Sequence, residues 1–280
     1  MWIIPRHTED IRMNARSLAG VMLASLAAAC SHRPRESTET WSWQADVPAG
    51  ATLHLRDVNG DITVRPATGG TLQVRATERW THGRADAVHF VGETRGNDVS
   101  VCAMFGNRGR CSADGYRARA LGYGHLFGFT WGSDAHADFV VALPPGVTLD
   151  ASTVNGGIIV RGATAPVTAK TVNGSVDAST ALGPMAASSV NGDIQARVDS
   201  LGKDTGPLSF VTVTGNVTVV LPASLSASAN LETVTGQITS EFPLTLEGQY
   251  GPHHARGTLG AGGTSLSLRT VTGNVTLRKR

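Results

Sequence analysis

The chain has 280 residues, of which 41% are hydrophobic and only 5% aromatic, and it contains 33 glycines. So few large side chains suit a narrow interior of Val, Ile, Ala and Thr better than a wide globular core. The formal net charge is +2 at pH 7, which argues against nucleic-acid binding as a function.

The amino-terminal segment has the pattern of an export signal. Arg12 and Arg16 precede an uncharged run, residues 17–29, that is too short to span a membrane. The run ends in Leu26-Ala27-Ala28-Ala29-Cys30, with small residues immediately before the cysteine. This pattern predicts an exported protein.

We expect residues 1–29 to be a lipoprotein signal peptide, with Met13 as an alternative start, and Cys30 to be the site of lipid attachment. An ordinary secretory signal is the alternative. Ser31 after the cysteine favours, by analogy, the outer membrane of a Gram-negative bacterium. Residues 30–44 are predicted to be a flexible tether between the lipid and the folded part.

Residues 45–142 are predicted to form early, irregular turns of a repeat fold. They contain Cys102 and Cys111, an even pair once Cys30 carries lipid. In an oxidising compartment we expect these two cysteines to form a disulfide, with free thiols as the alternative.

Residues 105–132 interrupt these early turns and gather aromatic side chains beside glycine and arginine. Such a segment is a candidate surface for stacking on sugars or lying at a membrane interface. Alternatively, it caps the end of the repeat fold, where bulky residues cover unpaired strands. The residues of this candidate surface are Tyr116, Arg117, Arg119, Tyr123, Phe127, Phe129 and Trp131.

Residues 143–280 carry the regular repeats. Each unit has a Val, then Asn or Thr, then Gly, a variable residue, and Val or Ile; a first copy lies at 58–62. The second positions of the seven copies are Asn59, Asn155, Asn173, Asn191, Thr214, Thr235 and Thr272. Repeats at a nearly fixed period stack on one another because one unit alone cannot bury its apolar face.

The spacing predicts a fold of class all-β: a single-chain parallel β-solenoid, as a β-roll or right-handed β-helix with about 18–23 residues per turn. Asn155, Asn173 and Asn191 are each 18 residues apart. Hairpins at each Asn-Gly are the alternative, but they do not require a constant step. The 37-residue step from Thr235 to Thr272 favours one distorted turn over 241–270 rather than an excursion from the coil.

Stacking gives the repeat positions physical roles. The Asn side chains are expected to hydrogen-bond along the stack as a ladder, which the Thr positions continue more weakly. We expect two internal apolar stacks, the first being Val154, Val172, Val190, Val213 and Val234 and the second Ile158, Val176, Ile194, Val217 and Ile238.

The T-V-N-G and T-V-T-G units, with Leu143-Pro144-Pro145-Gly146-Val147 and Leu221-Pro222 before two of them, resemble the bacterial putative-adhesin domain family of unknown function. The resemblance covers most of residues 45–280. It implies a β-strand repeat fold in an envelope protein or lipoprotein. The family supplies no enzymatic residues, so the resemblance implies no catalytic site.

Enzymatic patterns are weak in this chain. Glycosidases need two carboxylates in range of one bond, but Gly157 and Ser175 separate the equivalent positions Asp61 and Asp193. Two sets of residues are candidate metal ligands: His125, Asp134, His136 and Asp138, and the pair His253 and His254. We expect both sets to be solvated loop side chains rather than metal sites.

We therefore expect a non-enzymatic envelope scaffold or adhesin-like interaction module without a cofactor. Its expected partners are an envelope protein, a glycan or its own copies, and the membrane through the lipid anchor. One alternative is a ligand-binding component of an envelope-stress or regulatory system. The other is a carbohydrate-active enzyme on a β-helix.

Overall fold

The computed structural model describes residues 36–82, 88–105, 109–112, 117–118, 134–202, 206–247 and 253–280. They belong to one compact unit, Glu36–Arg280. The expected signal peptide and Cys30 lie outside the described residues. Within the described residues every regular element is a β-strand, and no helix is available to cross a membrane.

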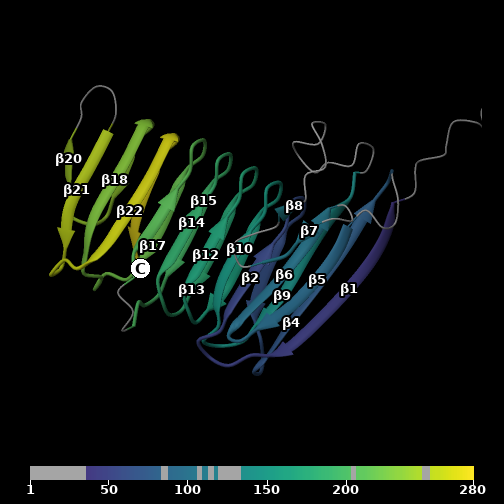
Figure 1. Ribbon diagram of the computed structural model, residues 1–280. Helices are drawn as coiled ribbons and strands as arrows, with labels where there is room; N and C mark the ends of the chain where they lie inside the picture. The colour runs from purple at the N-terminus through teal and green to yellow at the C-terminus, as the bar shows by residue number, and fades with distance from the viewer. Residues whose placement is uncertain are drawn as a thin grey trace, which may run out of the picture. The chain divides into compact units, whose positions relative to one another are not determined.

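Most strands belong to two sheets, which we call sheet 1 and sheet 2 (Figure 1). In spatial order, sheet 1 contains β1 (Ser37–Asp46), β4 (Thr71–Trp80), β9 (His136–Leu143), β3 (Ile62–Pro66), β11 (Ile158–Ala163), β13 (Val176–Thr180), β15 (Ile194–Val198), β17 (Val217–Leu221), β23 (Val275–Lys279) and β19 (Ile238–Ser240).

Sheet 2 contains, in spatial order, β20 (Thr245–Glu247), β21 (His253–Leu259), β18 (Ala227–Thr235), β22 (Thr264–Thr272), β16 (Leu208–Val211), β14 (Met185–Ser188), β12 (Val167–Lys170), β10 (Thr148–Ser152), β2 (Thr52–Arg56), β6 (Asp98–Phe105) and β5 (Val88–Arg95). A small separate pair is formed by β7 (Gly109–Arg110) and β8 (Arg117–Ala118).

The repeats wind between the two sheets. From β10 to β17 the chain alternates between sheet 2 and sheet 1, so each turn contributes one strand to each sheet. Successive turns pair in parallel and in register, as in Val176↔Ile194 and Val167↔Met185. The core lies between the two sheets and consists of the inward-facing side chains of both sheets. Side chains such as Ile158, Val176 and Leu208 are fully buried there.

Antiparallel strands flank this coil at both ends. β1, β4 and β9 pair antiparallel in sheet 1, as do β5 and β6 in sheet 2. At the opposite end β18, β21 and β20 are antiparallel. The fold is therefore all-β with parallel pairing between the repeats, but it is not the wholly parallel coil expected from the sequence.

The carboxyl-terminal repeat is inserted out of sequence order. β22 lies between β16 and β18, and β23 lies between β17 and β19. The chain first forms the turn that contains Thr235 and then the antiparallel strands β20 and β21. Afterwards β22 and β23 return and lie between that turn and the turn formed by β16 and β17. The expectation of one distorted turn over 241–270 was wrong, because antiparallel pairing with β18 carries this segment beyond the coil.

The expected disulfide is present and joins Cys102 of β6 to Cys111. Cys102 is fully buried, whereas Cys111 is partly exposed. The bond closes a short loop at the beginning of the aromatic segment.

Candidate functional site

The Val of six of the seven repeats is exposed on the surface, and Val58 of the first repeat is partly buried. Six of these side chains are 37–49% exposed, namely Val154, Val172, Val190, Val213, Val234 and Val271. The expected first internal stack was therefore wrong. The second expected stack is largely correct, since Ile158, Val176, Ile194 and Val217 are fully buried and Ile238 is partly buried against the core.

The bend of the chain between the two sheets explains why the first expected stack is on the surface and the second is in the core. Val172 continues the alternation of β12, in which Ala169 faces inward and Lys170 outward. At Gly174 the chain bends into β13, and Val176 then begins a new alternation that faces the core. Alternation with a period of two predicts which side chains point inward only within one strand. It does not carry over from β12 to β13, because the chain bends between them.

The residue before each exposed Val is buried and locks the corner. The Thr171 hydroxyl donates to the carbonyl oxygen of Gly156 in the adjacent turn at 2.8 Å. The same contact to the adjacent turn's glycine is made by Thr153, Ser189, Thr212, Thr270 and Thr233. These hydroxyls satisfy buried carbonyl groups and fix which neighbours point outward.

The second repeat position forms the ladder next to the Val row. The Asn173 side-chain amide donates to the Asn155 Oδ1 at 2.8 Å, and that of Asn191 donates to the Asn173 Oδ1 at 2.9 Å. Asn59 instead donates to the carbonyl oxygen of Ala135 at 2.7 Å. Isolated β-bridges connect the same positions in the order Asn59, Asn155, Asn173, Asn191, Thr214 and Thr272, and Thr272 is paired with Thr235.

The residue after each glycine adds a further row of contacts. The Asp193 Oδ1 accepts the backbone N–H of Asn216, and the Asn216 Oδ1 accepts that of Asn274. Asp61 accepts the backbone N–H of Gly157 in the same way. The variable position thus connects the backbone of consecutive turns, and its carboxylates are engaged in the stack.

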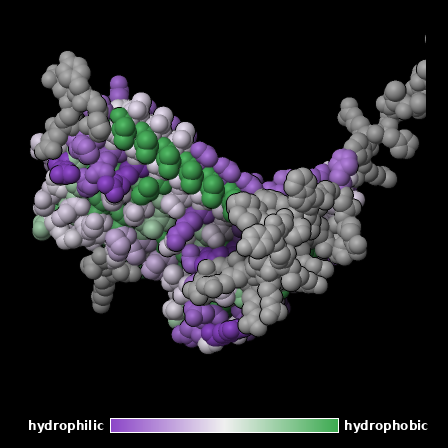
Figure 2. All heavy atoms as spheres, turned by 45° about the horizontal axis from the view of Figure 1, so that its top comes forward, coloured by the Kyte–Doolittle hydropathy of each residue, from purple (hydrophilic) through white to green (hydrophobic). Residues whose placement is uncertain are grey.

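Together the seven repeat valines form a continuous apolar row, which we call the Val ridge. In stacking order it consists of Val58, Val154, Val172, Val190, Val213, Val271 and Val234. Figure 2 shows it as a line of hydrophobic spheres crossing a largely polar surface. Buried Thr or Ser residues hold it from one side and the Asn and Thr ladder borders it on the other.

The flanks of the Val ridge differ in charge. On the sheet 2 side, two residues before each Val, the row reads Arg56, Ser152, Lys170, Ser188, Val211, Arg269 and Glu232 in stacking order. On the sheet 1 side, three residues after each Val, it reads Asp61, Gly157, Ser175, Asp193, Asn216, Asn274 and Gln237. Charged residues are few on both flanks: the first, which we call the basic flank, has three basic residues and one acidic residue, and the second, the acidic flank, has two aspartates and no basic residue.

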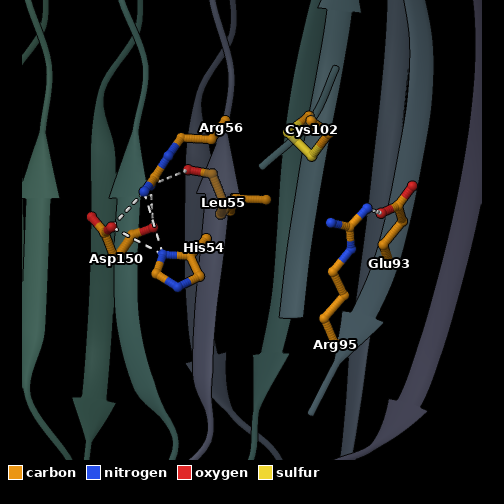
Figure 3. The surroundings of a disulfide bond; sticks show 8 residues. His54, Leu55, Arg56, Glu93, Arg95, Cys102 and Asp150 are labelled. Carbon is orange, nitrogen blue, oxygen red and sulfur yellow. Dashed lines mark hydrogen bonds and ion pairs between the residues drawn. A yellow bond between two sulfur atoms is a disulfide. The ribbon is translucent and has the colours of Figure 1, made fainter. Parts of the chain in front are cut away.

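A polar cluster lies on the outer face of sheet 2 near the disulfide (Figure 3). Arg56 donates to the Asp150 carboxylate and, at 2.6 Å, to the Asp150 carbonyl oxygen. His54 Nδ1 lies 3.1 Å from the same carboxylate, and its Nε2 lies 3.6 Å from that of Asp98. Burial raises the pKa of Asp150, but the Arg56 hydrogen bond and charge and the His54 contact outweigh it, so that pKa is lowered. These side-chain contacts join β2 to β10 and add to the backbone pairing of the two strands.

One buried carboxyl lacks the partners that the repeat supplies elsewhere. Asp57 occupies the Thr or Ser position of the first unit, and neither of its buried carboxylate oxygens has a hydrogen-bond partner among the described residues. Burial raises the pKa of Asp57 to about 7; N–H groups of Val58 and Asn59 oppose the rise, and the charges of Asp138 and Asp61 add to it.

Of the candidate metal ligands, Asp134, Asp138 and His254 have other contacts, and His125 lies outside the described residues. Asp134 accepts backbone N–H bonds from Thr81 and His82, and these hydrogen bonds lower the pKa of Asp134 to about 2. Asp138 pairs with Arg79, and His254 lies 3.7 Å from Glu232. In the described part of the chain, no three His, Cys, Asp or Glu side chains are grouped to hold a metal ion.

The candidate aromatic surface falls outside the described residues, apart from the backbone of Arg117 in β8. Its role as a binding surface or a cap stays a prediction. Described aromatics instead meet at the amino-terminal end of the sheets, where Trp41 stacks on Phe90 and Phe90 meets the edge of Phe139.

The fold and its surface define a class: a repeat protein coiled between two β-sheets, with polar ladders and an apolar row on one corner. The Toastrack DUF4097 family model matches residues 138–278, half of the chain. The chain therefore belongs to the Toastrack DUF4097 family, a domain of unknown function, and the resemblance seen in the sequence is confirmed.

Two crystal structures are similar to this chain. A putative cell adhesion protein from Clostridium sporogenes is 13% identical, with a TM-score of 0.48, and the match covers 89% of this chain and 100% of that one. A putative adhesin from Bacteroides fragilis is 12% identical, with a TM-score of 0.41, and the match covers 88% and 99%. No curated protein matches the chain.

Proposed function

We propose that this chain is a non-enzymatic, adhesin-like interaction module of the cell envelope, anchored as a lipoprotein through Cys30. The observation that carries this proposal is the Val ridge. Val recurs in all seven repeats and is exposed in six of them, although the residues two before and three after it vary. Single exposed apolar residues are ordinary, but a contiguous exposed row is characteristic of interaction surfaces.

The geometry of the Val ridge suits binding of a partner better than catalysis. The ridge presents one residue type at the same step over seven turns, which gives many similar weak contacts along a line. Asp61 and Asp193, the carboxylates of its sheet 1 flank, lie three levels apart in the stack and each accepts a backbone N–H bond. A regular line of contacts suits an extended partner such as an envelope protein or a glycan.

The test is capture of envelope material by the full chain and by a variant carrying Val172→Lys and Val190→Lys. Both positions are exposed, so we expect a change in the free energy of unfolding of about 1 kcal/mol or less. Capture should fall at least tenfold, because two charges then interrupt the apolar line.

The matched control carries Val140→Lys and Ile159→Lys, which alter equally exposed residues, 46% and 40%, on the outer face of sheet 1 away from the ridge. This control should capture as much as the natural chain. Equal capture by the ridge variant and the natural chain would remove the ridge from the proposed function.

A further inference from the structure

We propose that the Val ridge pairs with the Val ridge of a second copy of this chain, with the two ridges running in the same direction. This inference rests on the proposed function and names a partner for the same surface. Its evidence is the step of the ridge and the charge of its two flanks.

The step of the ridge favours a partner with the same step. Neighbouring turns are joined by parallel strand pairing, so consecutive ridge residues lie roughly 4.8 Å apart. A second ridge has the same spacing, so Val can meet Val at each of the seven levels. The neutral Asn and Thr ladder beside the ridge allows this approach, because no charge lies directly against the apolar row.

The flanks select the direction. When a two-fold axis runs parallel to the ridge, the basic flank of one copy faces the acidic flank of the other. Lys170 then lies one level from Asp193 of the second copy. Arg56 lies level with Asp61 of the second copy but is already paired with Asp150 of its own chain, so Lys170 and Asp193 carry the preference. Opposite charges across an interface fix register more than they add affinity.

The reversed arrangement lacks this complementarity. If the ridges run in opposite directions, acidic flank faces acidic flank. Asp193, at the fourth of seven levels, then lies opposite Asp193 of the second copy. Arg56 and Glu232, which the reversal would bring together, are already paired within their own chain with Asp150 and Arg269.

The pairing is expected to be weak in solution. A contact one residue wide is smaller than the roughly 1,200–2,000 Å² buried in stable interfaces, so we expect a dissociation constant on the order of 10⁻⁴ M. Copies anchored side by side on one membrane would reach effective concentrations of about millimolar, where such pairing is populated.

Single cysteines test the pairing and its direction. In the full chain with Cys30→Ser, the two native cysteines are joined to each other, so one added thiol reports its own contacts. Val154→Cys and Val271→Cys mark exposed positions four levels apart, at the second and sixth levels of the ridge. Each variant alone should form a disulfide-linked dimer under mild oxidation, and Ile159→Cys should remain monomeric.

Two results would overturn the inference. One is linkage no faster at either ridge position than at position 159. The other is linkage that requires a mixture of Val154→Cys and Val271→Cys, since reversal places the second level of one ridge opposite the sixth level of the other. If the natural chain captures no envelope material but the cysteine variants still link, the proposed function fails and the pairing stands. If the natural chain captures envelope material through its ridge but the cysteine variants do not link, only the pairing fails.

Discussion

Replacing Gly192 with alanine is expected to destabilise the fold by at least about 3 kcal/mol. An alanine Cβ at this corner would lie 2.0 Å from the carbonyl oxygen of Gly174 and 2.5 Å from its carbonyl carbon. Both contacts are with backbone, so no side chain can move aside. Relief requires these two turns to separate, which weakens the 2.9 Å bond from the Gly174 N–H to the Asn191 carbonyl oxygen.

Urea unfolding of the full chain, followed by circular dichroism, measures this change. Gly69→Ala is the control, since a Cβ there meets nothing within 4 Å, and it should alter the free energy of unfolding by less than about 1 kcal/mol. A loss below about 1 kcal/mol for Gly192→Ala as well would contradict the close stacking of the corners.

Asp57→Thr is expected to stabilise the protein above neutral pH. The pKa of Asp57 is raised from 3.8 to about 7 by burial, so the folded state binds its proton more tightly than the unfolded state. Its contribution to stability is fully present below about pH 4 and is lost as the pH rises through about 7. The loss amounts to on the order of 4 kcal/mol.

Threonine removes this titration and supplies the hydroxyl that six other turns carry at the same position. Chemical unfolding at pH 5 and pH 8 should show stability falling in the natural chain and changing much less in Asp57→Thr. Asp193→Asn, at an exposed position, should keep the pH dependence of the natural chain. The interpretation of Asp57 is wrong if both variants show the same difference between the two pH values as the natural chain.

The sequence predicts the repeat architecture well because parallel stacking repeats the same residue types at the same step. The Asn155, Asn173 and Asn191 ladder and the buried Ile158 and Val176 stack both follow from the 18-residue spacing. The Cys102–Cys111 bond was predicted from the number of cysteines together with the expected export of the chain.

Two features could not be predicted in the same way. The outward direction of Val172 depends on the bend at Gly174, where the alternation of one strand stops and another begins. A recurrent Thr or Ser immediately before each Val was the available signal, since a buried hydroxyl there implies an exposed neighbour. The insertion of β22 and β23 between earlier turns depends on long-range pairing, which the repeat pattern of residues 264–279 leaves open.

The most direct test of the Val ridge as an interaction surface is the rate of thiol labelling at position 172. The measurement uses the full chain with Cys30→Ser and Val172→Cys at nanomolar concentration, with and without envelope extract. Ile159→Cys serves as the exposed control, and Val176→Cys as the buried one. We expect rapid labelling at 172 in the isolated protein and at least fivefold protection in extract, with 159 unprotected. Slow labelling at 172 in the isolated protein, or equal labelling at 172 in extract, would contradict the account.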